Sequence, residues 1–340
     1  MKKNQRFILT ILKNMPVILF VVIFVVFSLL DNRFFSYANL ENIILSSSFV
    51  GIVAVGMTFV LLTGGIDLSV GAAMYIAGGT IALMLEQQIP LALAILAGVV
   101  AGTLLGVVNA FLISKLKIIP FMVTLGTLTA GRGLGLLITQ SRNISVPTEM
   151  RFGAVRFLGL PIPIITFLAV ILLAVVVLKF TPLGRQIYAM GNDPEAAKKA
   201  GLNTTRLTVI VYIISAFCAS VGSVIALSQQ GMVSANYGSG IEFRAIAAAV
   251  LGGTSLFGGS GAVFPGTLVG TLLVQMIQNG LVYLQVDLYV QDLISPMVIF
   301  FAVFVDAQRT GLLKRLERRN IRVEGGSELE HKIEPGTINP

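Results

Sequence analysis

The chain has 340 residues, of which 55% are hydrophobic and only 12% are charged, and its formal net charge is +8. A soluble domain carries roughly 45 to 50% apolar and about 25% charged residues. The proportions found here exclude an ordinary soluble enzyme, because too few polar side chains remain to cover its surface. The mean hydropathy of +0.89 instead predicts that the surplus apolar side chains face lipid.

About ten apolar segments follow one another with short connections. Each is close to the roughly 20 residues that a helix needs to cross a bilayer. Lipid leaves no solvent for exposed backbone groups, and these runs lack the alternation of a membrane barrel, so helices are required. The sequence therefore predicts an all-α, polytopic integral membrane helix bundle. The expected spans are 15–30, 43–63, 70–85, 90–113, 119–139, 162–180, 207–229, 243–258, 263–284 and 289–305.

Basic residues predict the orientation of the bundle, because cytoplasmic loops carry an excess of lysine and arginine. Most of the 24 lysines and arginines fall in alternate polar pieces, which places both termini of this multi-pass membrane protein in the cytoplasm. The net charge thus reflects topology and not a nucleic-acid-binding patch. The basic pieces are 1–14, 114–119, 179–206 and 306–340.

These pieces also divide the chain. We expect a cytoplasmic N-terminus (1–14), a transmembrane domain (15–308) with a cytoplasmic loop (179–206), and a cytoplasmic tail (309–340). The tail has mixed charge and few apolar residues, so it is expected to be disordered, with its basic cluster against anionic lipid or serving only as a topology anchor. The longest external loop runs over 140–161 and offers a surface to a partner outside.

Two glycine-rich passages share the pattern GGxxLxxG and suggest an internal repeat. One begins at Gly64, Gly65 and ends at Gly71; the other begins at Gly252, Gly253 and ends at Gly259. Each interrupts an apolar run, as the broken helices of transporters built from repeated halves do. The passages are six expected spans apart, which makes the repeat parallel, although a chance match of glycine-biased segments remains an alternative.

Asp67 is the most informative carboxylate, because it lies between these glycines at membrane depth, where a charge costs several kcal/mol unless it is paired or hydrated. One interpretation is a gate or pathway residue beside a sharp backbone turn. The other is a cap, with Ser69 in the first turn of the helix that starts near Val70. The two interpretations are compatible.

Neutral polar side chains supply the remaining pathway candidates. Gln275, Gln278 and Asn279 have the spacing that places three carboxamides on one helical face. Carboxamides match sugar hydroxyls without a charge, but an interhelical hydrogen-bonded seam explains the spacing equally well. Asn109 and Thr124 belong to a sparser polar line that is expected to join helices.

Arg132 is expected to lie inside a span and therefore needs a partner, for which Asp67 and Glu242 are candidates. The chain contains no GxxxxGK[ST] phosphate loop and no relay of acids and histidines. Neither ATP hydrolysis by that route nor proton pumping is indicated. A clustered catalytic set is also lacking, so the sequence does not suggest an enzyme, and no cofactor or metal is expected.

The cytoplasmic loop from Thr181 to Arg206 is where a separate energy-supplying subunit would bind. Asp193 is the expected N-cap of a short helix, with Pro194 at its first position and Gly201 as the C-cap. A plain helical connector accounts for the same residues. The residues alone leave both interpretations open.

Four passages in order resemble one family. LTGGIDLSVGA (62–72), PFMVTLGT (120–127), LGRQIYAMGNDPEAAKKAG (183–201) and AIAAAVLGGTSLFGGSGAVFPGTLVG (245–270) are similar to the permease subunits of bacterial ABC importers for monosaccharides such as ribose, xylose, arabinose and galactosides. The resemblance runs from about residue 15 to 308.

The resemblance implies that two permease chains, identical or related, form the pathway, that a cytoplasmic ABC-type ATPase engages the loop, and that a periplasmic sugar-binding protein docks outside. The matching ATPase-coupling residues are the EAAxxxG core and its flanks: Arg185, Gly191, Glu195, Ala196, Ala197 and Gly201. The IxLP ending of the longer coupling motif is missing. For the glycine passages the resemblance names no sugar-contacting atom.

Two other transport functions compete with sugar import. An ion-coupled secondary transporter would need an acid pair or cation cage at mid-membrane, where only Asp67 and Arg132 are candidates. A related ABC permease for a nucleoside, an amino acid or a sugar-derived signal is the second. An amino-acid path would have to accept both charged ends, whereas these candidates are mostly amides and hydroxyls.

Overall fold

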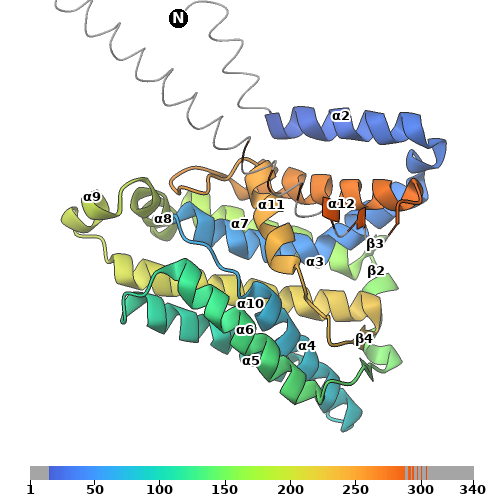
Figure 1. Ribbon diagram of the computed structural model, residues 1–340, viewed down its shortest axis with the longest axis horizontal. Helices are drawn as coiled ribbons and strands as arrows, with labels where there is room; N and C mark the ends of the chain where they lie inside the picture. Colours follow the sequence, from blue (N-terminus) through green and yellow to red (C-terminus); the bar gives the residue numbers. More distant parts are fainter. Residues whose placement is uncertain are drawn as a thin grey trace, which may run out of the picture.

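The computed structural model describes residues 15–287 and seven further positions, the last of them Phe304. The N-terminal piece 1–14, the tail 309–340 and most of the expected span 289–305 lie outside the described residues. The all-α prediction is confirmed, and each expected span up to residue 284 contains a helix (Figure 1). The helices are α2 (Met15–Leu30), α3 (Tyr37–Leu62), α4 (Val70–Glu86), α5 (Leu91–Ser114), α6 (Pro120–Thr139), α7 (Ile162–Phe180), α8 (Pro182–Asn192), α9 (Pro194–Lys199), α10 (Thr204–Gln230), α11 (Ile241–Leu251) and α12 (Leu268–Tyr283).

Among the described residues, five helices are long and apolar enough to cross a membrane: α3, α5, α6, α7 and α10. Two of them form the centre of the bundle, since 78% of the apolar window of α3 and 67% of that of α10 is buried. The corresponding share is only 22 to 33% for α5, α6 and α7. These three helices therefore keep a broad apolar face for lipid or for another protein chain.

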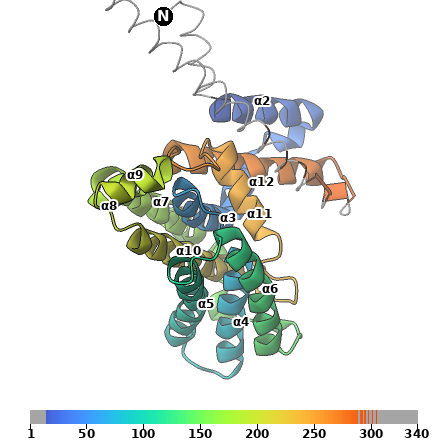
Figure 2. The ribbon, with the colours of Figure 1, turned by 60° about the vertical axis from the view of Figure 1, so that its left-hand side comes forward.

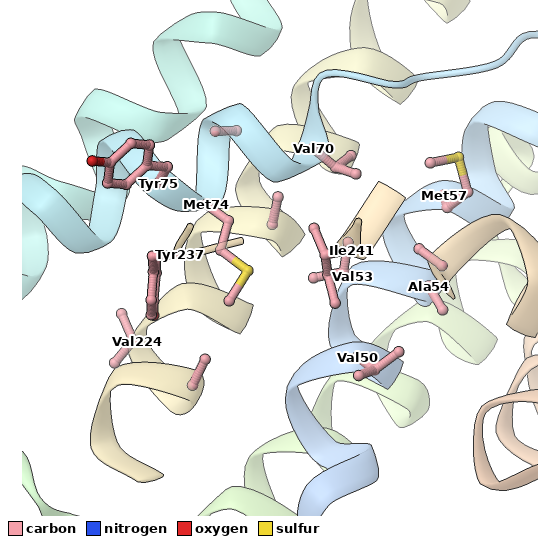
Figure 3. Packing of buried hydrophobic residues seen from close by; sticks show 14 of the residues in the cluster. Val50, Val53, Ala54, Met57, Val70, Met74, Tyr75, Val224, Tyr237 and Ile241 are labelled. Carbon is pink, nitrogen blue, oxygen red and sulfur yellow. The ribbon is translucent and has the colours of Figure 1, made fainter. Parts of the chain in front are cut away.

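The core lies where α3, α4, α10 and α11 meet. Figure 3 shows Val53 of α3 and Met74 of α4 in this cluster, with Val224 of α10 and Ile241 of α11 close by. Helix α10 packs against α3, α4 and α5. Helices α4, α5 and α6 also pack against one another and form one group beside α10 (Figure 2). Helix α12 packs against α2, α3 and α11 on the other side of α3.

The two long loops lie at opposite ends of the bundle, as the topology predicts (Figure 1). The expected external loop contains β1 (Ile144–Ser145), η2 (Thr148–Met150), η3 (Phe152–Ala154), β2 (Arg156–Phe157) and β3 (Leu160–Pro161). Strand β1 pairs with β4 (Met232–Val233) after α10, and β2 pairs with β3, both antiparallel.

Ion pairs tie the same loop to the helix ends. The guanidinium of Arg142 lies 2.7 Å from the carboxylate of Glu86 on α4, and Arg156 pairs with Glu41 on α3. The loop is therefore fixed over one end of the bundle, with the chain between α7 and α10 at the other.

The expected span 243–258 ends earlier than predicted, because α11 stops at Leu251. Gly252 caps the helix, and Gly253 follows with a φ of +94°, a conformation that ends a right-handed helix. The chain becomes regular again in η4 (Val263–Thr267), directly before α12. The glycine passage is thus a true interruption between two short helices.

Helix α5 approaches α10 closely through a glycine. A Cβ added at Gly106 would lie 2.6 Å from the carbonyl oxygen of Tyr212, whereas one added at Gly126 on the exposed face of α6 would meet nothing within 4 Å. We expect Gly106→Val to destabilise the folded chain by about 1 to 3 kcal/mol through overpacking. Gly126→Val is the matched control and should leave the melting temperature of the detergent-solubilised protein unchanged or raise it. Equal melting temperatures for the two variants would contradict this packing.

Candidate functional site

Residues 63–69 interrupt the helical chain between α3 and α4, and Asp67 in this break is completely buried. Gly64 allows the turn with a φ of +76°. One carboxylate oxygen of Asp67 accepts hydrogen bonds from the backbone N–H of Ser69 (2.9 Å) and from the Ser69 hydroxyl (2.6 Å). Helix α4 starts at Val70, as expected, so Asp67 orders the residue that precedes its first turn.

The second carboxylate oxygen of Asp67 accepts a hydrogen bond from the hydroxyl of Ser215 on α10, at 2.8 Å. Asp67 therefore does not pair with Arg132, although the sequence offered Asp67 as one of two candidate partners for that arginine. Arg132 donates to the carbonyl oxygen of Ala235 (3.1 Å), and its guanidinium lies over the ring of Tyr75 (5.5 Å). Asp67 thus accepts hydrogen bonds from one N–H and two hydroxyl groups. The contribution of Ser215 from α10 could not be read from the sequence around residue 67.

A chain of hydrogen bonds extends from the break to α5 and α6. The Asn109 amide donates to the Ser69 hydroxyl (2.7 Å), and the Thr127 hydroxyl donates to the Asn109 carbonyl (2.7 Å). Two more hydroxyls reach the carbonyl oxygen of Ile66, from Thr124 (3.3 Å) and from Tyr212 (3.4 Å). The polar line through Asn109 and Thr124 does join helices, as expected, and it does so at the break.

Sequence reasoning did not single out Tyr212 or Ser215. They are three residues apart on α10, so they share one face of that helix. Polar side chains at this spacing inside a strongly apolar run are the signal that would have found them.

The second glycine passage contacts the first one and α8. The Gly259 N–H donates to the Leu62 carbonyl at the end of α3 (3.0 Å). A Cβ added at Gly258 would lie 2.7 Å from the Gly191 carbonyl of α8 and 2.9 Å from the Gly64 nitrogen, and one added at Gly191 would overlap the Leu62 carbonyl. Only glycine permits these approaches. We call the contact of Gly64, Gly191, Gly258 and Gly259 the glycine junction.

A side-chain hydrogen bond from α8 lies beside the junction. The hydroxyl of Tyr188 on α8 donates to the carbonyl oxygen of Gly261, at 2.9 Å. Partial burial raises the pKa of the Tyr188 phenol, which keeps it a donor. Both glycine passages thus lie at the end of the bundle that carries α8.

The short helix expected in the 179–206 loop is present as α9, and its predicted N-cap Asp193 is confirmed. Its C-cap is Ala200, one residue before the predicted Gly201. The Asp193 carboxylate accepts hydrogen bonds from the N–H groups of Glu195 and Ala196 (both 3.0 Å), with Pro194 at the first position. Gly201 has a φ of +84° directly after the cap residue Ala200.

Helix α8 before it was missed, although Thr181 followed by Pro182 is a recognisable start signal. Of the coupling candidates, Arg185, Glu195, Ala196 and Gly201 are exposed, while Gly191 and Ala197 are buried. The loop therefore presents one surface to solvent and holds the other against the bundle.

The α12 amides form a separate group. The Gln275 amide donates to the Asn279 carbonyl (2.9 Å), both side chains are largely buried, and Gln278 is half-buried. At the start of this segment, before α12, Gly266 packs against the Gly252 backbone. Because α12 packs against α2, α3 and α11, these amides lie on the far side of α3 from the hydrogen bonds of Asp67.

The family model described as "Branched-chain amino acid transport system / permease component" matches residues 39–303. The ribose import permease protein of Haemophilus influenzae is 36% identical over 292 residues, which cover 84% of this chain and 90% of the relative. The D-allose transport system permease protein of Escherichia coli is 35% identical over 292 residues (85% and 89%).

A probable ABC transporter permease protein of Escherichia coli is 31% identical over 299 residues (86% and 90%). No solved structure matches the chain. The family match covers most of the helical bundle, including both glycine passages and the loop with α8 and α9. The chain belongs to this family of ABC-importer permease components.

Proposed function

We propose that this chain is the transmembrane permease subunit of an ATP-driven importer and forms the path that moves a monosaccharide, a ribose-type pentose or a hexose, across the bacterial inner membrane. The observation that carries the proposal is the similarity to ribose and allose permeases over more than four fifths of the chain. Apart from the buried Asp67, the hydrogen-bonded side chains at the break are neutral hydroxyls and an amide, which agrees with a neutral cargo.

ATP hydrolysis belongs to a separate subunit in this proposal, since the sequence has no phosphate loop. The exposed surface of α8 and α9, with Arg185 and Glu195, is the docking surface for that ATPase. Its buried surface contacts both glycine passages through the glycine junction. A displacement of α8 therefore displaces the end of α3, the break that follows it and the passage after α11, which is how ATP binding would alter the pathway.

The opposite end of the bundle receives the periplasmic sugar-binding protein. The loop over residues 140–161 is fixed there by two ion pairs and by the β1–β4 pairing, so it can serve as a firm docking surface. A second permease chain, in a homodimer, completes the pathway. The exposed apolar faces of α5 and α7, which include Leu96, Leu104 and Leu172, suit membrane lipid. Both termini face the cytoplasm.

The family description favours an amino acid as the second candidate cargo. A free amino acid carries one positive and one negative charge. The hydrogen-bonded network around Asp67 offers hydroxyls and amides with a single carboxylate, so it matches only one of these two charges. The relatives' names favour the sugar.

Reconstituted uptake tests the proposed function. Proteoliposomes that contain this chain, the ATPase and the binding protein should accumulate D-ribose or a related sugar only when ATP is present on the ATPase side. Omitting the ATPase or the binding protein should abolish accumulation. Accumulation by this chain alone, or its loss to an uncoupler at constant ATP, would contradict the proposal.

Substitutions on the exposed surface and on the buried surface of the coupling loop should have different effects on ATPase binding and on uptake. Gly201→Pro cannot adopt the φ of +84°, so we expect the ATPase to be lost on co-purification while the permease persists.

Gly191→Ala displaces α8 from the Leu62 carbonyl, so the ATPase should still co-purify while sugar uptake falls at least about 10-fold. Wild-type uptake by Gly191→Ala would rule out transmission through the junction.

Asp67 is expected to act through its hydrogen bonds. Asp67→Ala removes the acceptor for three donors and leaves the Ser215 hydroxyl and the Ser69 groups unsatisfied, which costs about 1 to 3 kcal/mol per buried group. We expect a lower melting temperature and little uptake. Asp67→Asn keeps one acceptor oxygen and should retain more of both. Equal effects of the two substitutions would show that the hydrogen bonds are not what Asp67 contributes.

A further inference from the structure

Arg132 is a cation on α6 whose side chain is only partly satisfied. Its guanidinium lies over the Tyr75 ring and donates through Nη2 to the Ala235 carbonyl. The other terminal nitrogen, Nη1, is buried and has no hydrogen-bond partner among the described residues. The ring and the carbonyl therefore fix the guanidinium and leave one strong donor unused.

Glu242 in the first turn of α11 has the complementary property. Its side chain is 5% exposed, and its Oε2 atom is buried without a hydrogen-bond partner in the described part of the chain. This oxygen lies against Gly71 of α4, where an added Cβ would overlap it. Helix α4 thus brings the two groups into one region, with Tyr75 one turn after Gly71.

The two charged groups lie against the same helix but are not paired with each other. The salt bridges of the described residues do not include this pair. Leaving a buried charged donor and a buried charged acceptor unused costs several kcal/mol. Ionisable groups at membrane depth are retained mainly where they serve a function.

Several exposed residues adjoin the half-buried Arg132. Gly133 beside it lies on the exposed face of α6, and a Cβ added there would meet nothing within 4 Å. Thr129, one turn earlier, is exposed, and so are Ala235 and Asn236 in the segment that Arg132 contacts. Nη1 itself is covered in this conformation, so a ligand reaches it only when α6 or the segment around Ala235 moves, as the rocking of helices during transport would allow.

We infer that Arg132 and Glu242 form a hydroxyl-binding pair that contacts the sugar during its passage, with Tyr75 as a positioning residue for Arg132. This inference rests on the proposed function and assigns it a contact site. Each sugar hydroxyl both donates and accepts, so one hydroxyl can accept from Nη1 while a neighbouring one donates to Oε2. The pair carries no net charge, which suits a neutral polyol.

Uptake kinetics and chemical protection test the pair together. In proteoliposomes with the ATPase and the binding protein, Glu242→Gln and Arg132→Gln should each lower D-ribose uptake at least about 10-fold at low sugar concentration. Asp31→Asn and Arg33→Gln, which remove the exposed ion pair between α2 and α3, are the matched charge controls and should stay within about twofold of the wild type.

The second measurement does not depend on transport, so it still tests sugar binding when a variant is inactive in uptake for another reason. In the purified full chain, Thr129→Cys should react with a charged thiol reagent, and millimolar D-ribose should slow that reaction. The parent chain, whose only cysteine is the buried Cys218, gives the background. Protection should disappear when Glu242→Gln is added.

The outcomes separate the two proposals. Absence of uptake by the wild type would refute the proposed function, while protection by D-ribose would still support the pair. Normal uptake by Glu242→Gln, or no protection by D-ribose, would overturn the pair. Protection by L-leucine but not by D-ribose would overturn it as a sugar site and identify a zwitterion site.

Discussion

The structure depends on satisfying the polar groups of a broken helix without water. In a bilayer the backbone groups and the carboxylate of residues 63–69 must find their partners inside the protein. They find them in hydroxyls and an amide from three other helices: Ser215 and Tyr212 on α10, Asn109 on α5, and Thr124 on α6. The break therefore determines which helices must pack together, and α10 lies at the centre for this reason.

The same constraint joins the break to the coupling loop. Glycines at 64, 191, 258 and 259 let three backbones meet with no side chains between them. Such a contact adjusts little when one of the segments moves, because backbone atoms cannot change rotamer as side chains do. A mechanical signal that arrives at α8 can thus reach both glycine passages over a short path. The proposed transport, in which a separate ATPase rocks the helices, needs this kind of firm connection.

Hydropathy predicted the spans well because continuous apolar runs carry the information locally. The boundaries of α2 and α6, the Asp193 cap and the break at Gly64 all follow from residues within a few positions. The partner of Asp67 was not predictable in the same way, since Ser215 is 148 residues away. The glycine junction combines residues that the sequence suggested separately, as repeat and as coupling loop, and only the tertiary structure shows that they touch.

Hydrogen–deuterium exchange on the assembled importer, with and without ATP bound, tests the central claim most directly. If α8 and the two glycine passages form one mechanical unit, the amides of residues 63–69, 182–192 and 252–262 should exchange slowly and change together when ATP binds. A change confined to 182–192, with both passages unaffected, would contradict the account.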